Sequence, residues 1–149
     1  LAEMLTTLEL ESEHPVRRSL CGSCHRCLDA CPTGALSPEG MDARRCISYL
    51  TVEHHDEVSP ELTRRMGNRL FGCDSCQDAC PFNHRPKPTK LFPSYDTILD
   101  LSREDITEMS LEEYHRIFQQ SPARRANYKW MTRNCRLWLE NNPPTDADN

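Results

Sequence analysis

Residues 21–32 read CGSCHRCLDACP, a run of four cysteines that ends in a proline: Cys21, Cys24, Cys27, Cys31 and Pro32. The spacing C-x2-C-x2-C-x3-C-P is that of [4Fe-4S] ligand runs in proteins with two clusters. In such runs three thiolates bind one cluster and the fourth binds the other. A second run is therefore expected elsewhere in the chain.

That second run lies at residues 73–81, which read CDSCQDACP and repeat the C-x2-C-x3-C-P half of the first. It lacks a leading cysteine, and Cys46 can supply one. Exchange of the last ligand between the runs then assigns eight cysteines to two clusters. The first cluster is predicted to be bound by Cys21, Cys24, Cys27 and Cys80. The second is predicted to be bound by Cys46, Cys73, Cys76 and Cys31.

Cysteines at short spacings also occur in zinc sites and in disulfide frameworks. Pairs of C-x2-C units are typical of tetrahedral zinc, but longer runs that end in Cys-Pro are not a zinc pattern. A disulfide framework suits a short secreted chain, and the sequence shows no secretory signal. The ninth cysteine, Cys135, falls on an expected helix and is predicted to be an ordinary buried thiol.

The composition suits a small domain in which inorganic clusters replace part of the apolar core. The chain has 149 residues, of which 37% are hydrophobic, and a mean hydropathy of -0.72. Iron removal is therefore expected to unfold much of the domain. The formal net charge of -5 excludes attraction of nucleic acid by bulk charge, so any such contact must be local. No apolar run approaches the length of a membrane span, which predicts a cytoplasmic protein without a membrane partner.

The sequence predicts a mostly α-helical fold with short β ribbons: a bacterial-type, ferredoxin-like domain with two [4Fe-4S] clusters, a helical insertion and C-terminal helices. The cluster-binding part is expected at residues 21–92, with the insertion at 42–67, and the C-terminal helical segment at 93–149. Residues 1–20 resemble the tail of an upstream domain, which suggests that the chain is a piece of a longer protein.

The insertion is predicted to be a helical hairpin. Asp42 is expected to cap a helix that runs to about His55 and buries the face with Ala43, Cys46, Ile47 and Leu50. A second helix is expected from Ser59, with proline in its first position, to Gly67.

Three further helices are predicted beyond the second run. Ser102 with Asp105, and Ser110 with Glu113, have the spacing of capping boxes. The longest helix is expected to begin at Ser121-Pro122 and to end near Asn141. Its predicted apolar face consists of Ala123, Ala126, Trp130, Leu137 and Trp138.

Two groups of cations are candidate contacts for a phosphate backbone, although solvated surface is at least as good an interpretation. The first lies in the proline-rich loop after the second run and contains His84, Arg85, Lys87 and Lys90. The second is a stripe beside the apolar face of the last helix and contains Arg125, Lys129, Arg133 and Arg136.

The wording around these motifs resembles that of the epoxyqueuosine reductase family. The similar phrases are CGSCHRCLDACPTGAL, MDARRCISYLTVEH, MGNRLFGCDSCQDACPFN and SPARRANYKWMTRN, at residues 21–36, 41–54, 66–83 and 121–134. The resemblance implies two [4Fe-4S] clusters that pass electrons from a donor to cobalamin, which reduces epoxyqueuosine to queuosine in tRNA. It also implies that an upstream domain binds most of the cobalamin and carries the catalytic acid.

On this resemblance Ser48, within CISYL, is a candidate cobalamin contact, and residues 53–56 are expected near the RNA. The chain by itself is expected to transfer electrons without turning over substrate. Two alternatives remain open at this stage. One is a free-standing ferredoxin-like carrier, and the other is the iron–sulfur domain of another corrinoid enzyme, such as a reductive dehalogenase.

Overall fold

The computed structural model describes residues 4–11, 19–84, 91, 98 and 100–143. The cysteine-rich part contains α1 (Arg26–Asp29), β1 (Leu36–Ser37), β2 (Gly40–Met41), α4 (Ser75–Asp78) and the 3-10 turn η2 (Pro81–Asn83). Between the cysteine runs lie the 3-10 turn η1 (Ala43–Arg45), α2 (Ile47–Val52) and α3 (Pro60–Met66). The C-terminal part contains α6 (Arg103–Glu108), α7 (Leu111–Phe118), the 3-10 turn η3 (Pro122–Ala126) and α8 (Asn127–Asn141).

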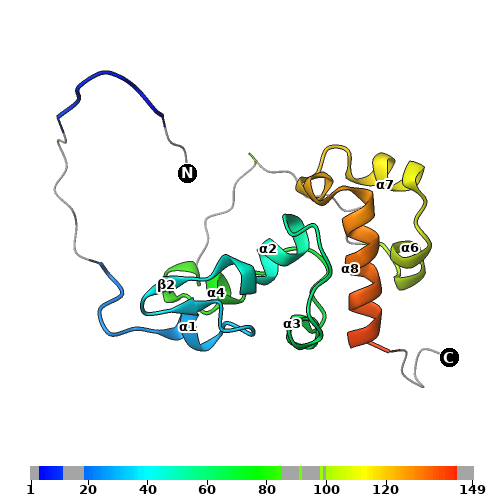
Figure 1. Ribbon diagram of the computed structural model, residues 1–149, viewed down its shortest axis with the longest axis horizontal. Coiled ribbons are helices and arrows are strands. Elements are labelled where there is room, and N and C mark those ends of the chain that lie inside the picture. Colours follow the sequence, from blue (N-terminus) through cyan, green and yellow to red (C-terminus); the bar gives the residue numbers. More distant parts are fainter. Residues whose placement is uncertain (1–3, 12–18, 85–90, 92–97, 99, 144–149) are drawn as a thin grey trace.

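The elements are arranged along the long axis of the molecule (Figure 1). The short helices α1 and α4 and the β1–β2 hairpin form one end, and α6, α7 and α8 form the other, with α2 and α3 between them. The strands pair antiparallel, with Leu36 opposite Met41 and Ser37 opposite Gly40. The predicted fold class of helices with a short β ribbon is therefore confirmed. None of the described helices is long and apolar enough to cross a membrane.

Several helix ends lie where the sequence predicted them. Ser102 and Ser110 each accept a hydrogen bond from the backbone three residues on, and the carboxylates of Asp105 and Glu113 bond back to the caps. These reciprocal bonds satisfy backbone donors that a helix start leaves unpaired. The helix α3 likewise follows its Ser59 cap and ends at Met66, and its C-cap is Gly67, whose φ of 59° favours glycine.

The prediction of one helix from Asp42 to about His55 is wrong, because the helix is interrupted at Cys46 and ends at Val52. Asp42 does cap, accepting from Arg44 N, but only the short η1 turn follows. At Cys46 the backbone is extended, with φ -71° and ψ 123°, and α2 then runs only to Val52. Two hydrogen bonds from Arg45 to the carbonyl of Thr33 hold η1 against the first cysteine run. This tertiary contact competes with local helix propensity, which is only a weak preference.

The last helix also begins later than predicted. Ser121 caps the 3-10 turn η3 rather than an α-helix, and its side chain accepts from Ala123 N. At Asn127 φ is 51° and ψ is 171°, a backbone conformation that residues with a side chain rarely adopt, and it separates η3 from α8. The side chain of Asn127 then accepts from Trp130 N and caps α8, which ends at Asn141 as predicted.

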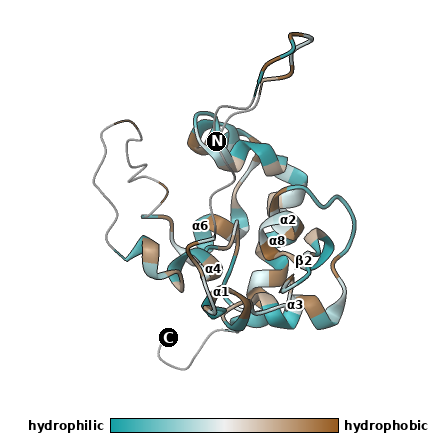
Figure 2. Cartoon of the chain, turned by 90° about the vertical axis from the view of Figure 1, so that its left-hand side faces the viewer, coloured by the Kyte–Doolittle hydropathy of each residue, from teal (hydrophilic) through white to brown (hydrophobic). Residues whose placement is uncertain are grey.

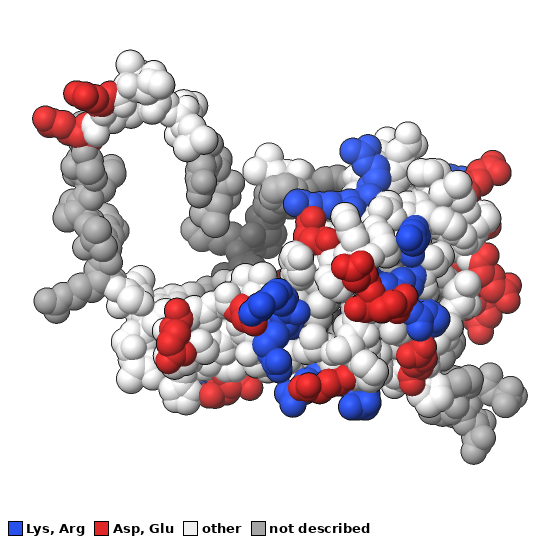
Figure 3. Space-filling model, in the orientation of Figure 1, with Lys and Arg blue, Asp and Glu red and all other residues white. Residues whose placement is uncertain are grey.

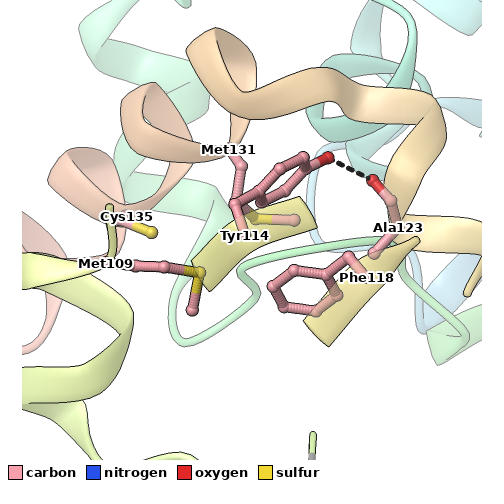
Figure 4. Packing of buried hydrophobic residues seen from close by; sticks show 6 residues of the cluster. All are labelled: Met109, Tyr114, Phe118, Ala123, Met131 and Cys135. Carbon is pink, nitrogen blue, oxygen red and sulfur yellow. Dashed lines mark hydrogen bonds between the residues drawn. The ribbon is translucent and has the colours of Figure 1, made fainter. Parts of the chain in front are cut away.

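Two hydrophobic clusters stabilise the C-terminal part and the insertion. The helices that form them carry both apolar and polar residues (Figure 2). The α7–α8 cluster consists of Met109, Tyr114, Phe118, Ala123, Met131 and Cys135 (Figure 4). The insertion cluster consists of Ile47, Leu50, Val58, Met66 and Leu137. Because Leu137 belongs to α8, the last helix packs on both sides and joins the insertion to the C-terminal helices.

Tyr114 is the centre of the α7–α8 cluster. It is 1% exposed, and its hydroxyl donates to the carbonyl of Ala123 over 3.0 Å (Figure 4). We expect Tyr114→Phe to lower the free energy of unfolding by about 1–2 kcal/mol, because a buried hydrogen bond is lost. Urea denaturation of the reconstituted chain measures this, with Tyr49→Phe, at a side chain on the surface, as the control. A change of less than about 0.5 kcal/mol in both variants would contradict the assigned role of the hydroxyl.

Candidate metal centre

The first predicted cysteine set consists of Cys21, Cys24, Cys27 and Cys80, and the fold brings all four to one place. They line a hollow of about 200 Å³ together with Leu20, Arg26, Pro81 and Phe82. Three of the cysteines come from the loop and helix α1, and the fourth follows α4, which packs against α1. A turn closed by Cys24 N donating to Cys21 O over 2.9 Å shapes the loop.

Three members of the second predicted set, Cys46, Cys73 and Cys76, also lie near one another. Cys46 and Cys73 both act electrostatically on the thiol of Cys76. Cys73 packs against the insertion cluster, and the backbone N–H of Gly72 donates to Thr51 Oγ1 over 2.9 Å. That bond ties the start of the second run to α2, the helix that Cys46 precedes.

Cys31, the fourth member of the second set, is linked to the others through the backbone that follows it. The carbonyl of Thr33 accepts two hydrogen bonds from Arg45, at 3.0 and 2.8 Å, directly beside Cys46. The carbonyl of Pro32 accepts from Arg65 of α3 over 3.4 Å. The end of the first run is therefore anchored to the insertion. The predicted ligand exchange requires this, because it assigns Cys31 to the same cluster as Cys46 of the insertion.

The surroundings of Cys31 and Cys76 act on their thiols in opposite directions. At Cys31 burial raises the pKa, but hydrogen bonds from the backbone of Leu36, from Thr33 and from Ala35 outweigh it, so the pKa is lowered. At Cys76 burial, aided by the neighbouring thiols, raises the pKa. Since the thiolate is the form that binds metal, Cys31 is preorganised for ligation, whereas Cys76 gains its charge when metal displaces the proton.

The donor set fits iron–sulfur clusters chemically. All eight predicted ligands are free cysteines, and soft thiolates are the ligands that such clusters take. Among the described residues, no three His, Cys, Asp or Glu side chains converge on a point suited to a single ion. Around the first set the thiols instead surround a hollow, as the ligands of a cuboidal cluster must.

The other predicted site residues lie on the insertion and on α8. Ser48 is half-buried in the first turn of α2 and stays a prediction as a cobalamin contact. Cys135 is 4% exposed, and burial raises the pKa of its thiol to about 11. The prediction that Cys135 is a buried thiol is confirmed. The loop cations Arg85, Lys87 and Lys90 lie outside the described residues, whereas His84 is exposed.

The interpretation of Arg133 as part of a phosphate-binding stripe is wrong. Arg133 is 7% exposed, and its guanidinium donates to the carbonyls of Leu50, His54 and Asp56 at 2.6–2.7 Å. The neighbouring Asn134 donates to the carbonyl of Thr51 over 2.7 Å. Together they satisfy carbonyls in the last turn of α2 and in the segment that follows it, near the helix C-terminus, where a positive charge is favourable. No local pattern predicted this pairing, which joins residues 83 positions apart.

The remaining cations of the stripe do not form a continuous basic surface. Arg125 pairs with Glu53, and Arg136 pairs with Glu57 over 2.7 Å and with Glu140 over 3.2 Å. Lys129 lies over the ring of Trp130, 4.6 Å from its centroid, and His55 stacks on the same ring. Blue and red side chains accordingly alternate on the face in Figure 3. The predicted apolar face is also shifted, because Trp130 and Trp138 are half-buried while Met131 and Cys135 are buried.

Comparison with known proteins defines the class of this site. Residues 20–83 match the family described as "4Fe-4S double cluster binding domain", a range that contains all eight predicted ligands. This part of the chain is therefore similar to domains that bind two [4Fe-4S] clusters.

The relatives that match a larger share of the chain are epoxyqueuosine reductases. The protein of that name from Pseudomonas aeruginosa is 39% identical over 97% of this chain and 41% of its own length. The one from Cellulophaga algicola is 38% identical over 90% of this chain and 44% of its own length. The resemblance that the sequence predicted is thereby confirmed, and the chain spans about two fifths of these relatives.

Solved structures agree with this result. Epoxyqueuosine reductase from Bacillus subtilis superposes with a TM-score of 0.75 and 35% identity, over 89% of this chain and 36% of that one. A structure of epoxyqueuosine reductase with an epoxyqueuosine-modified tRNA-Tyr stem loop gives a TM-score of 0.75 and 36% identity, over 88% of this chain and 35% of that one.

Proposed function

We propose that this chain is the electron-transfer part of an epoxyqueuosine reductase. In this role it passes electrons from a donor through two [4Fe-4S] clusters toward cobalamin, which supplies the reducing power for converting epoxyqueuosine to queuosine in tRNA. The chain's own residues hold the clusters and set the path between them. An upstream domain, of which residues 1–20 are the tail, would hold most of the cobalamin and the catalytic acid.

One observation carries this proposal. Cys80 belongs to the second run, yet it lines the same hollow as Cys21, Cys24 and Cys27 of the first. That is the exchanged arrangement in which two-cluster domains hold their clusters. The exchange also keeps the two sites adjacent, since each run supplies ligands to both. Adjacent clusters suit electron transfer.

The wider assignments rest on the similarity to epoxyqueuosine reductases. They comprise the cobalamin contact at Ser48, the proximity of residues 53–56 to tRNA, and a cytoplasmic location. They also comprise the division into a cluster-binding part at residues 21–92, with its insertion at 42–67, and a helical segment at 93–149. The hydrogen bonds of Arg133 support one further part of this proposal, namely that the C-terminal helical segment stabilises the insertion.

Anaerobic reconstitution with iron and sulfide tests the central proposal. We expect about eight irons per chain and, after dithionite reduction, interacting EPR signals from two clusters, because each [4Fe-4S] cluster is bound by four thiolates. Iron and sulfide are counted, and the spectra are recorded at low temperature. Tight zinc binding without an EPR signal would refute the electron-transfer role.

A further inference from the structure

A hydrogen-bonded chain connects an arginine to a thiol of the second cysteine set. The guanidinium of Arg69 donates to Ser75 Oγ over 2.7 Å, and Ser75 Oγ lies 3.5 Å from Cys73 Sγ. Arg69 also donates to the carbonyl of Met66, the last residue of α3, over 3.2 Å. Two anchors therefore fix the guanidinium between the end of α3 and the start of α4.

The direction of this chain follows from its donors and acceptors. A cluster-bound Cys73 is a thiolate and has no proton to give. In this structure the Cys73 thiol donates to Ser75 Oγ. When Cys73 is bound as a thiolate, the direction reverses: Ser75 Oγ accepts from Arg69, and its own proton can turn to Cys73 Sγ. The positive charge of Arg69 polarises the hydroxyl and strengthens that donation.

The first cysteine run contains a matched position without this chain. Ser23 stands between Cys21 and Cys24 as Ser75 stands between Cys73 and Cys76. Ser23 is exposed and forms no hydrogen bond with any other residue that the structure describes. Arg26, which lines the hollow of the first set, lies at an exposed position, where water screens its charge.

Other arginines near the second set are partly neutralised. Arg45 and Arg65 lie 3.8 and 3.5 Å from the carboxylate of Glu61. Within the described part of the chain, Arg69 forms no ion pair with a carboxylate. It is half-buried, so its charge is less screened than that of a surface arginine.

We propose that the Arg69–Ser75 pair raises the reduction potential of the second cluster above that of the first. Hydrogen bonds to cluster sulfur and nearby positive charge both favour the reduced, more negative state. When the chain receives one electron, the second cluster is then reduced and the first stays oxidised. This inference rests on the proposed function, because it takes Cys73 to be a cluster ligand.

Potentiometric titration of the reconstituted full chain, followed by low-temperature EPR, tests the proposal. Ser75→Ala and Arg69→Met are expected to lower the reduction potential of the second cluster. Arg69→Lys keeps the positive charge and is expected to lower that potential by less than Arg69→Met does. Ser23→Ala is the matched control and is expected to leave both potentials unchanged. The signals are assigned with Cys24→Ser, which removes a ligand of the first set.

Unchanged potentials in both Ser75→Ala and Arg69→Met, with iron retained, would overturn the proposal. So would an equal shift in Ser23→Ala, which would be a general effect of removing a hydroxyl. If Ser75→Ala alone loses iron, the potential measured in Arg69→Met decides whether the proposal stands. If both variants lose the second cluster, Arg69 and Ser75 are needed to hold that cluster, and the proposal that they set its potential is overturned. Failure of the unsubstituted chain to bind clusters would instead refute the proposed function.

Discussion

Replacing Cys46 with serine is expected to lower the iron content of the reconstituted chain from about eight to about four atoms, because one of two [4Fe-4S] clusters loses a ligand. Serine has nearly the same shape as cysteine but offers a hard oxygen in place of a soft thiolate. The remaining irons should belong to the first set, whose hollow is lined by residues of the loop before α1, of α1 itself and of the segment that follows α4. Iron and sulfide analysis with EPR measures both quantities.

Two further variants make this result specific. Cys24→Ser should also leave about four irons, but with the EPR signal of the other cluster. Cys135→Ala removes the buried thiol of the α7–α8 cluster and should leave about eight. Retention of all iron in Cys46→Ser would exclude Cys46 as a ligand. Loss of all iron would show that the two clusters do not assemble independently.

Arg133→Ala is expected to lower the free energy of unfolding by about 3–5 kcal/mol, a large part of the stability of a small domain. The substitution removes the donors for the carbonyl of Leu50 in α2 and for those of His54 and Asp56 in the segment after it. Those carbonyls lie against α8, where water cannot easily replace the guanidinium. Because α2 begins directly after Cys46, we expect the second cluster to become labile as well.

Anaerobic urea denaturation of the reconstituted chain, followed by far-UV circular dichroism, measures this effect. Arg136→Ala is the matched control one helical turn away, since its ion pairs with Glu57 and Glu140 are exposed. The control should change the free energy of unfolding by less than about 1 kcal/mol. Equal effects of the two substitutions would contradict the role assigned to Arg133.

Features that depend on neighbouring residues could be read from the sequence. The capping boxes at Ser102 and Ser110 and the cap at Ser59 involve bonds across only three residues, so their side chains and backbone meet in any chain that forms the helix. The cysteine spacing is similarly local, and it predicted the class of domain to which residues 20–83 are similar.

Continuity of helices could not be read in this way. The break at Cys46 accompanies the contact of Arg45 with Thr33, twelve residues earlier. The helical periodicity of the last helix placed Arg133 in a stripe of cations beside the apolar face, because a guanidinium is normally exposed. Burial becomes favourable only because α2 ends against α8 with unpaired carbonyls.

The sequence by itself determined the domain class, the helix caps and the set of eight candidate ligands, since spacing along the chain fixes which side chains can meet within a loop or a helical turn. Only the tertiary structure gave Arg133 its role at the end of α2 and positioned Arg69 beside Ser75. The physical reason is that a buried polar group needs a partner, and the partner is chosen by how the helices pack. Packing joins residues whose separation along the chain carries no pattern.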